Sequence, residues 1–289
     1  MSNLYHPKRS PSRFFEVQHN VTFESDQQVF MREVQDWSTG HFTAGFSSPA
    51  DLRDEVTAAL RDLELSRAVG PVDEAEMLGR AKTLLPDNRQ SPGARLILVV
   101  AGGPKQQVIR PKDLEAQELE EAITREALFG SFRVFDRRLG TKCVVRDEQL
   151  MIEQDKNSIQ LDQLGTVRVI VSLDPPKDDQ RFGLAGVAIQ EAVEESLQKT
   201  LKFAASLLDR VDPLRRISDV VIVAALQGAL TWRSRAEHQR SPNSYSMRSS
   251  TEPAVVHLTP ARRHRAALMQ DTRTLAEDLT VLLGRRLRP

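Results

Sequence analysis

The sequence holds a single cysteine, Cys143, and no long apolar segment in its 289 residues. One thiol excludes an intrachain disulfide framework and is typical of a protein from a reducing cytoplasm. No stretch approaches the roughly 18 consecutive apolar residues of a membrane-spanning helix. The basic residues near the N-terminus are not followed by the apolar stretch of a secretory signal. We therefore expect a cytoplasmic protein that does not associate with a membrane.

The short motifs of several enzyme classes are also missing. The chain contains no GxxxxGK(S/T) or GxGxxG pattern for phosphate binding and no HExxH or CxxC pattern for zinc. Cys143 lies in the apolar run TKCVV, and no base is visible near it, so we interpret it as a half-buried side chain rather than a nucleophile. The pair Glu237-His238 could do acid–base chemistry, but such pairs more often form a solvated helix end. The sequence thus favours a protein without catalysis of its own, predicts no metal site and leaves the cofactor unknown.

Positive and negative charges balance over the whole chain, with 40 basic and 40 acidic residues. Arginine nevertheless gathers in the range 232–289, close to Trp232. Clustered arginines beside an aromatic ring can contact phosphates and stack a nucleic-acid base. The arginines that would do so are Arg233, Arg235, Arg262, Arg263 and Arg265. The alternative is a solvated polar face on a terminal helix, which needs no ligand.

Residues 48–64 have the clearest helical pattern in the chain. Ser48 stands at the N-cap, Pro49 at the first helical position and Asp51 three residues after the cap. The apolar residues that follow fall on one stripe, which we expect to be buried against a sheet. They are Leu52, Val56, Leu60 and Leu63.

Punctuation by glycine and proline predicts the organisation of the chain. We expect a disordered arm over 1–13, an α/β segment over 14–68, a linker over 69–94 and an α+β domain over 95–289. The last of these should hold a mixed, largely antiparallel sheet with long helices, because short alternating strands follow one another between polar turns.

Three stretches of this last domain have more specific interpretations. The buried strand 95–101 is followed by Gly102-Gly103, interpreted as a hairpin turn rather than a ligand loop. The apolar run 217–226 is either a strand or a helix segment, since periodicity does not decide. Thr259-Pro260 is expected to begin the terminal helix, which would carry Arg262, Arg263 and Arg265.

The segment from about Val21 to Ala68 resembles the C-terminal part of the DUF4062 module of bacterial proteins. The matching features are the helix Phe30–Val34, Trp37 with Gly40-His41-Phe42, and Ser48-Pro49-Ala50-Asp51-Leu52 leading into the next helix. The resemblance implies part of a TIR-like, flavodoxin-like α/β fold. It also implies a link to nucleotide binding or processing in bacterial signalling or defence.

The opening strand, the central strand and the acidic helix of that family have no counterpart in this sequence, so no catalytic residue is carried over. We expect a bacterial interaction or sensing protein, with a protein partner or a second copy of itself. The first alternative is a truncated nucleotide-processing, TIR-like effector. The second is a nucleic-acid-binding module that uses the arginine-rich C-terminal region.

Overall fold

The structure, a computed structural model, describes residues 48–54, 56–57, 71–85, 93–173, 186–229, 231–241 and 252–288. The chain divides into two units, Met1–Leu60 and Arg61–Pro289. The expected arm 1–13 and most of the expected segment 14–68 lie outside the described residues. The partial TIR-like, flavodoxin-like fold of that segment therefore stays a prediction.

The described part of the first unit is a helical stretch that follows Ser48. The backbone N–H of Asp51 donates to Ser48 Oγ at 3.1 Å, which confirms the predicted N-cap. Leu52 and Val56 are 39% and 48% exposed, so the expected burial of these two side chains is wrong. The helical pattern predicts a common side for these residues but does not determine what covers that side. Leu60 and Leu63 lie outside the described residues.

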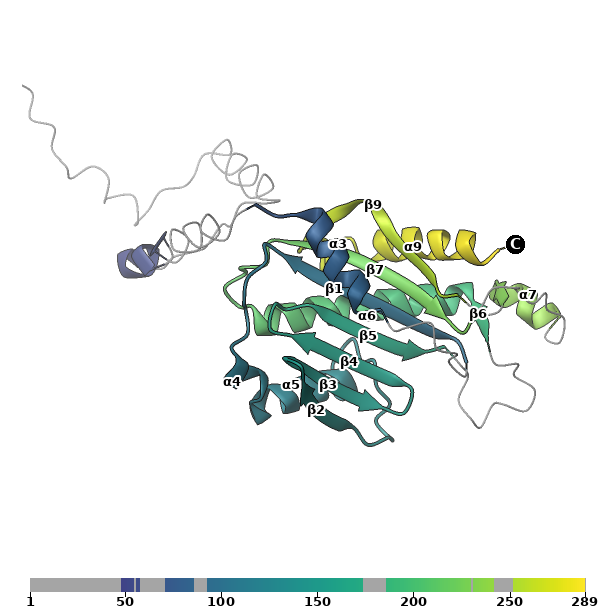
Figure 1. Cartoon of the computed structure of the whole chain (residues 1–289), viewed down its shortest axis with the longest axis horizontal. Helices are drawn as coiled ribbons and strands as arrows, with labels where there is room; N and C mark the ends of the chain where they lie inside the picture. The colour runs from purple at the N-terminus through teal and green to yellow at the C-terminus, as the bar shows by residue number, and fades with distance from the viewer. Residues whose placement is uncertain are drawn as a thin grey trace, which may run out of the picture. The chain divides into compact units, whose positions relative to one another are not determined.

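The second unit is built on a seven-stranded antiparallel sheet (Figure 1). In spatial order its strands are β2 (Lys142–Arg146), β3 (Gln149–Gln154), β4 (Asn157–Asp162), β5 (Val167–Ser172), β1 (Arg95–Gly103), β7 (Asp219–Gln227) and β9 (Ala254–His264). Strands β2 to β5 form the expected meander, and β1 pairs between β5 and β7. The expectation of an antiparallel sheet packed with helices is confirmed at this level.

Helices cover both faces of the sheet. The main core brings together one face of the sheet with α5 (Gln117–Phe129), α6 (Gln190–Val211) and α9 (Thr272–Leu287), and with the short α4 (Pro111–Leu114) and α8 (Ala267–Gln270). The opposite face carries α3 (Glu74–Thr83). A small parallel pair, β6 (Val187–Ile189) and β8 (Thr231–Arg233), precedes α6 and α7 (Arg235–Arg240) respectively.

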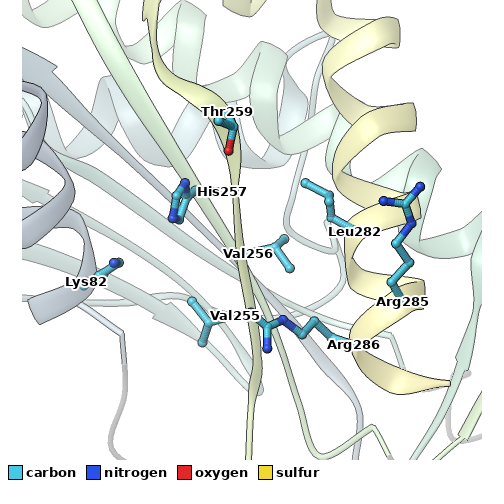
Figure 2. Close-up of a pocket in the computed structure, with 8 residues that line it drawn as sticks. All are labelled: Lys82, Val255, Val256, His257, Thr259, Leu282, Arg285 and Arg286. Atoms are coloured by element: carbon cyan, nitrogen blue, oxygen red, sulfur yellow. The ribbon is translucent and has the colours of Figure 1, made fainter. Parts of the chain in front are cut away.

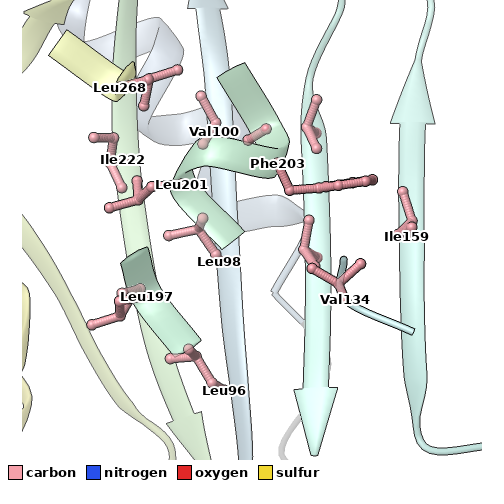
Figure 3. Close-up of a cluster of buried hydrophobic side chains, with 14 of the residues drawn as sticks. Leu96, Leu98, Val100, Val134, Ile159, Leu197, Leu201, Phe203, Ile222 and Leu268 are labelled. Carbon is pink, nitrogen blue, oxygen red and sulfur yellow. The ribbon is translucent and has the colours of Figure 1, made fainter. Parts of the chain in front are cut away.

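Strand β1 shows how the sequence specifies this layering. Leu96 and Leu98 enter the main core with Leu197 of α6 (Figure 3), while Ile97 and Val99 enter the second core. A strand covered on both faces reads as an almost continuous apolar run, which is why this one stands out in the sequence. The run 217–226 has the same character, and the structure resolves it as strand β7.

Helix α3 lies in the range 69–94, which we interpreted as a linker with one short helix near Asp73–Leu84. Asp73 caps it by accepting the N–H of Ala75 at 2.9 Å and that of Glu76 at 3.2 Å. Met77 and Ala81 are buried against the sheet. This part of the range is therefore a structural layer of the second unit.

The glycine pair Gly102-Gly103 lies inside β1 rather than in a turn or a ligand loop. A Cβ atom on Gly102 would lie 2.6 Å from Cγ2 of Ile217, and one on Gly103 would overlap Met77 Sδ. The absence of side chains lets neighbouring segments approach the strand on both faces, which explains the pair without a ligand.

Candidate functional site

The candidate site is a groove along β9, the strand at one edge of the sheet (Figure 2). Its volume is about 660 Å³. Eight residues line it: Lys82, Val255, Val256, His257, Thr259, Leu282, Arg285 and Arg286. Lys82 comes from α3 and the last three come from α9, so the groove lies around the strand between a helix on each face.

Strand alternation positions the β9 side chains. Ala254, Val256 and Leu258 point into the main core below α9, while Val255 packs against the second core on the side of α3. His257 is partly exposed on that second side, and its Nδ1 lies 3.0 Å from the carbonyl oxygen of Leu258. The side chains thus attach the strand to both layers and leave its outer edge to the backbone.

The pairing register with β7 determines which backbone N–H and C=O groups of β9 point to the outside of the sheet. Arg262 pairs with Val221 but sends its N–H to a Glu74 carboxylate oxygen at 3.2 Å, away from β7. In an antiparallel ladder, residues of one pair exchange both hydrogen bonds and those of the next pair face outward. Two and four positions after Val221, the residues Val223 and Ala225 therefore also direct their backbone N–H and C=O groups toward β1. Their partners on β9 are His257 and Val255, whose N–H and C=O groups must point to the outside of the sheet.

One end of this edge is closed. Ala261 and Arg262 both donate their N–H groups to the carboxylate of Glu74, at 3.4 and 3.2 Å. Pro260 has no N–H to offer, and the pairing with β7 is irregular beside it. Among the described residues, the stretch around Val255 to His257 is the part of the edge whose outer amides donate to no such partner.

Cationic side chains flank the open part on both sides. Figure 2 shows Lys82 reaching toward β9 from α3, and Arg286 reaching toward it from α9. Arg285 lines the same wall. Within the described ranges none of the three forms an ion pair, and no carboxylate is among the eight lining residues. The groove is thus a backbone edge between positive walls.

The five arginines predicted from the sequence lie on two parts of the second unit. Arg262, Arg263 and Arg265 lie at and just beyond the end of β9, because the strand continues through Pro260 and the expected terminal helix begins later, at α8 and α9. That correction has a physical cause: proline fits both a first helical turn and an edge strand, and pairing with β7 decides between them.

These three arginines are held by contacts within the protein. Arg265 is buried and its two terminal nitrogens each lie 2.8 Å from a carboxylate oxygen, one of Asp212 and one of Asp209. Arg262 Nε lies 2.8 Å from Asp219 Oδ1. Arg263 donates to the backbone carbonyl of its own neighbour Arg262 at 3.0 Å.

The other two arginines lie beside α6 and α7. Arg233 donates to the carbonyl of Ser241 at 2.8 Å. Arg235 donates from its backbone to Glu191 at 2.8 Å and lies 3.2 Å from Glu195 through Nη2. Whether any of the five contacts nucleic acid stays a prediction, and the structure does not bring them together on one face.

The pair Glu237-His238 belongs to α7. Glu237 accepts the N–H of Ser234 at 2.8 Å, and Ser234 Oγ accepts the N–H of Glu237 at 3.2 Å, which forms a capping box. These hydrogen bonds lower the pKa of the Glu237 carboxyl below its ordinary value. The Glu237 carboxylate therefore stabilises the start of α7. This agrees with the interpretation of Glu237-His238 as part of a solvated helix end.

Cys143 is partly buried on β2. Burial, together with the charge of Glu120, raises the pKa of its thiol to about 12. A thiol that stays protonated near neutral pH is a poor nucleophile. Within the described ranges, no three His, Cys, Asp or Glu side chains are grouped so that they could hold a metal ion.

Lys82, Arg285 and Arg286 were not among the residues predicted from the sequence. Arginines in the last turn of a helix are also favoured by the helix dipole, so their presence there does not by itself indicate a ligand. The signal that could have identified them is their position on elements that flank an edge strand, and this position depends on contacts between distant segments.

Among the residues that the structure describes, no helix has the length and apolar content needed to cross a bilayer. No protein-family model matches the chain. A comparison with curated proteins gives no match, and neither does a comparison with solved structures. The resemblance of residues 21–68 to the DUF4062 module therefore stays a prediction.

Proposed function

We propose that this chain is an interaction protein that binds an extended segment of a partner protein as an added strand beside β9. The observation that carries this proposal is the outward-facing backbone of Val255 and His257, on an edge strand between two helical walls. An edge strand offers a row of N–H and C=O groups to an incoming chain, and flanking pockets then select its side chains.

The two edges of the sheet differ in the way expected for one protected edge and one binding edge. Strand β2 is five residues long and carries the exposed cations Lys142 and Arg146, which discourage pairing with another strand. Strand β9 is 11 residues long, and no charged side chain stands between Ala254 and Leu258. A partner strand would therefore add at β9 rather than at β2.

Glu74 gives the proposed site a boundary. Its carboxylate occupies the edge amides of Ala261 and Arg262, so an added strand would end before Pro260. The remaining open length, about five residues from Ala254 to Leu258, is close to the common length of a strand in a sheet. Recognition would then combine a short ladder with contacts to the two walls.

An interaction role also agrees with the chemistry of the groove. His257 is the one histidine among the eight lining residues, and no carboxylate or thiol lines the groove beside it. The alternative of a nucleotide-processing effector rests on the resemblance of residues 21–68, and the observations at β9 neither need it nor oppose it.

The test uses the intact chain and three synthetic peptides in which valine alternates with glutamate, threonine or lysine. Amide resonances or hydrogen exchange would be followed at Val255, Val256 and His257. We expect at least one peptide to protect the amides of Val255 and His257, which face outward. The amide of Val256 should change little, because it already belongs to the ladder with β7.

Backbone methylation of the peptide provides the matched control. N-methyl groups on alternate residues that face β9 should abolish binding, and the same number on the other alternate residues should leave it intact. Failure of all three peptides to protect Val255 and His257 would overturn strand addition.

A further inference from the structure

The positive side chains that line the β9 groove form no ion pair in the described part of the protein. Lys82 faces the strand from α3, and Arg285 and Arg286 line it from α9. Most other arginines near β9 are engaged: Arg262 lies 2.8 Å from Asp219 Oδ1, and Arg265 lies 2.8 Å from Asp212 Oδ2. The groove cations thus stand apart as a set available to a ligand.

We infer that the partner segment is acidic, with Asp or Glu side chains directed toward the wall of α9. This inference rests on the strand addition proposed above, and it specifies the chemistry of the added strand. A guanidinium can bind a carboxylate through two parallel hydrogen bonds, so two adjacent arginines on one wall favour carboxylates over other polar groups.

The geometry of a strand determines which side chains meet these cations. Successive side chains of an added strand point to opposite faces of the sheet, so every second residue faces α9 and the others face α3. On the α9 side the carboxylates would meet Arg285 and Arg286 next to the apolar surface of Leu282. On the α3 side they would meet Lys82 beside His257, where a single positive charge selects less strongly for carboxylates.

Electrostatic complementarity of this kind discriminates between partners more strongly than it adds affinity. A segment in which lysine alternates with valine would place positive charge against the cations of whichever wall its lysines face, and should bind most weakly. A neutral segment could still form the backbone ladder. The inference therefore predicts an order of affinity among the three peptides: glutamate–valine first, threonine–valine second and lysine–valine last.

The decisive variant is Arg285→Gln/Arg286→Gln. Each exposed ion pair contributes modestly, so we expect the glutamate–valine peptide to bind about tenfold more weakly to this double variant. Binding of the threonine–valine peptide should not change. The matched control is Lys112→Gln/Arg125→Gln, which removes the same charge from exposed positions on α4 and α5, away from β9, and should leave both affinities unchanged. Thermal unfolding of each variant establishes that the fold is intact.

The outcomes separate this inference from the proposed function. If all three peptides protect Val255 and His257 with equal affinity, the acidic preference is refuted and strand addition stands. If none protects them, both are refuted. If the Arg285→Gln/Arg286→Gln variant loses binding of a single-stranded oligonucleotide but not of the glutamate–valine peptide, the groove cations serve nucleic acid and the acidic-segment inference is overturned.

Discussion

Arg265 Nη1 lies 2.8 Å from Asp212 Oδ2, and the Asp212 side chain is completely buried. The same carboxylate accepts a hydrogen bond from the backbone N–H of Ile217 at 2.8 Å and another from Nε–H of Arg216 at 3.2 Å. A buried carboxylate with several donors and one buried cation ties the end of α6 to the segments before β7 and after β9. The arginine that the sequence offered for phosphate contact is thus part of the internal structure.

We expect Arg265→Ala to lower the free energy of unfolding by about 3–5 kcal/mol, because it removes the buried cation beside Asp212. The control is Arg263→Ala, whose guanidinium donates only to backbone carbonyls at the end of β9. That change should cost less than about 1 kcal/mol. Urea denaturation measures both, and similar small losses in the two variants would contradict a structural role for the pair.

Gly102→Ala should destabilise the second unit by about 1–3 kcal/mol, because the new Cβ would lie 2.6 Å from Ile217 Cγ2 inside a packed core. Gly79→Ala is the contrasting change. Its Cβ meets nothing within 4 Å on α3, and alanine is the better helix former, so we expect a gain of about 0.5–1 kcal/mol. Calorimetry should show melting temperatures that move in opposite directions, and a neutral Gly102→Ala would refute the close-packing explanation.

The thiol of Cys143 should react slowly with Ellman's reagent in the folded protein. Its pKa rises from the ordinary 9.0 to about 12, so near pH 8 the folded chain holds about a thousandfold less thiolate than the unfolded chain. Glu120→Gln removes a negative charge beside the sulfur and should speed the reaction. A folded rate equal to that in urea would show that the thiol is not protected.

The same shift has a consequence for stability. Below pH 9 the thiol is protonated in both states and contributes nothing to the pH dependence. Above pH 9 the unfolded chain loses its proton first, so the Cys143 contribution should make the protein less stable as pH rises. A Cys143→Ser variant should lack this part of the alkaline slope in urea denaturation, and an unchanged slope would contradict the assignment.

Leu52→Ala should change the free energy of unfolding by less than about 0.5 kcal/mol, because the side chain is substantially exposed. The control is Leu197→Ala, in the fully buried main core, with an expected loss of about 2–5 kcal/mol. A comparable loss for Leu52→Ala would show that this helix buries its apolar stripe in solution.

Local patterns were sufficient for the elements whose own residues carry the evidence. The run 95–101 predicts β1 because both of its faces are apolar, and the stripe that includes Leu197 and Leu201 predicts α6. Ser48 likewise predicts its cap, because capping involves neighbours in the chain. In each case the residues that determine the structure are close together in sequence.

Pairing between distant segments determines the features that the sequence did not predict. Thr259-Pro260 resembles a helix start, yet strand β9 extends through it, and pairing with β7 resumes at Arg262 after an irregular stretch, which changes the setting of Arg262 and Arg265. The groove likewise depends on contacts between segments that are distant in the sequence. Lys82 and Arg286 are far apart in the chain, and they flank one strand only because α3 and α9 cover opposite faces of the sheet.

The position of β1 between β5 and β7 has a consequence for synthesis of the chain on the ribosome. The meander β2–β5 joins neighbouring strands through short turns, so its contacts close soon after they are made, and β5 can then pair with one side of β1. The other side of β1 waits for β7, which follows the long helix α6. Until then a nascent chain presents the apolar residues Leu96 to Val100 with one unpaired edge. We therefore expect this edge of β1 to be open to pairing with another chain while α6 is translated.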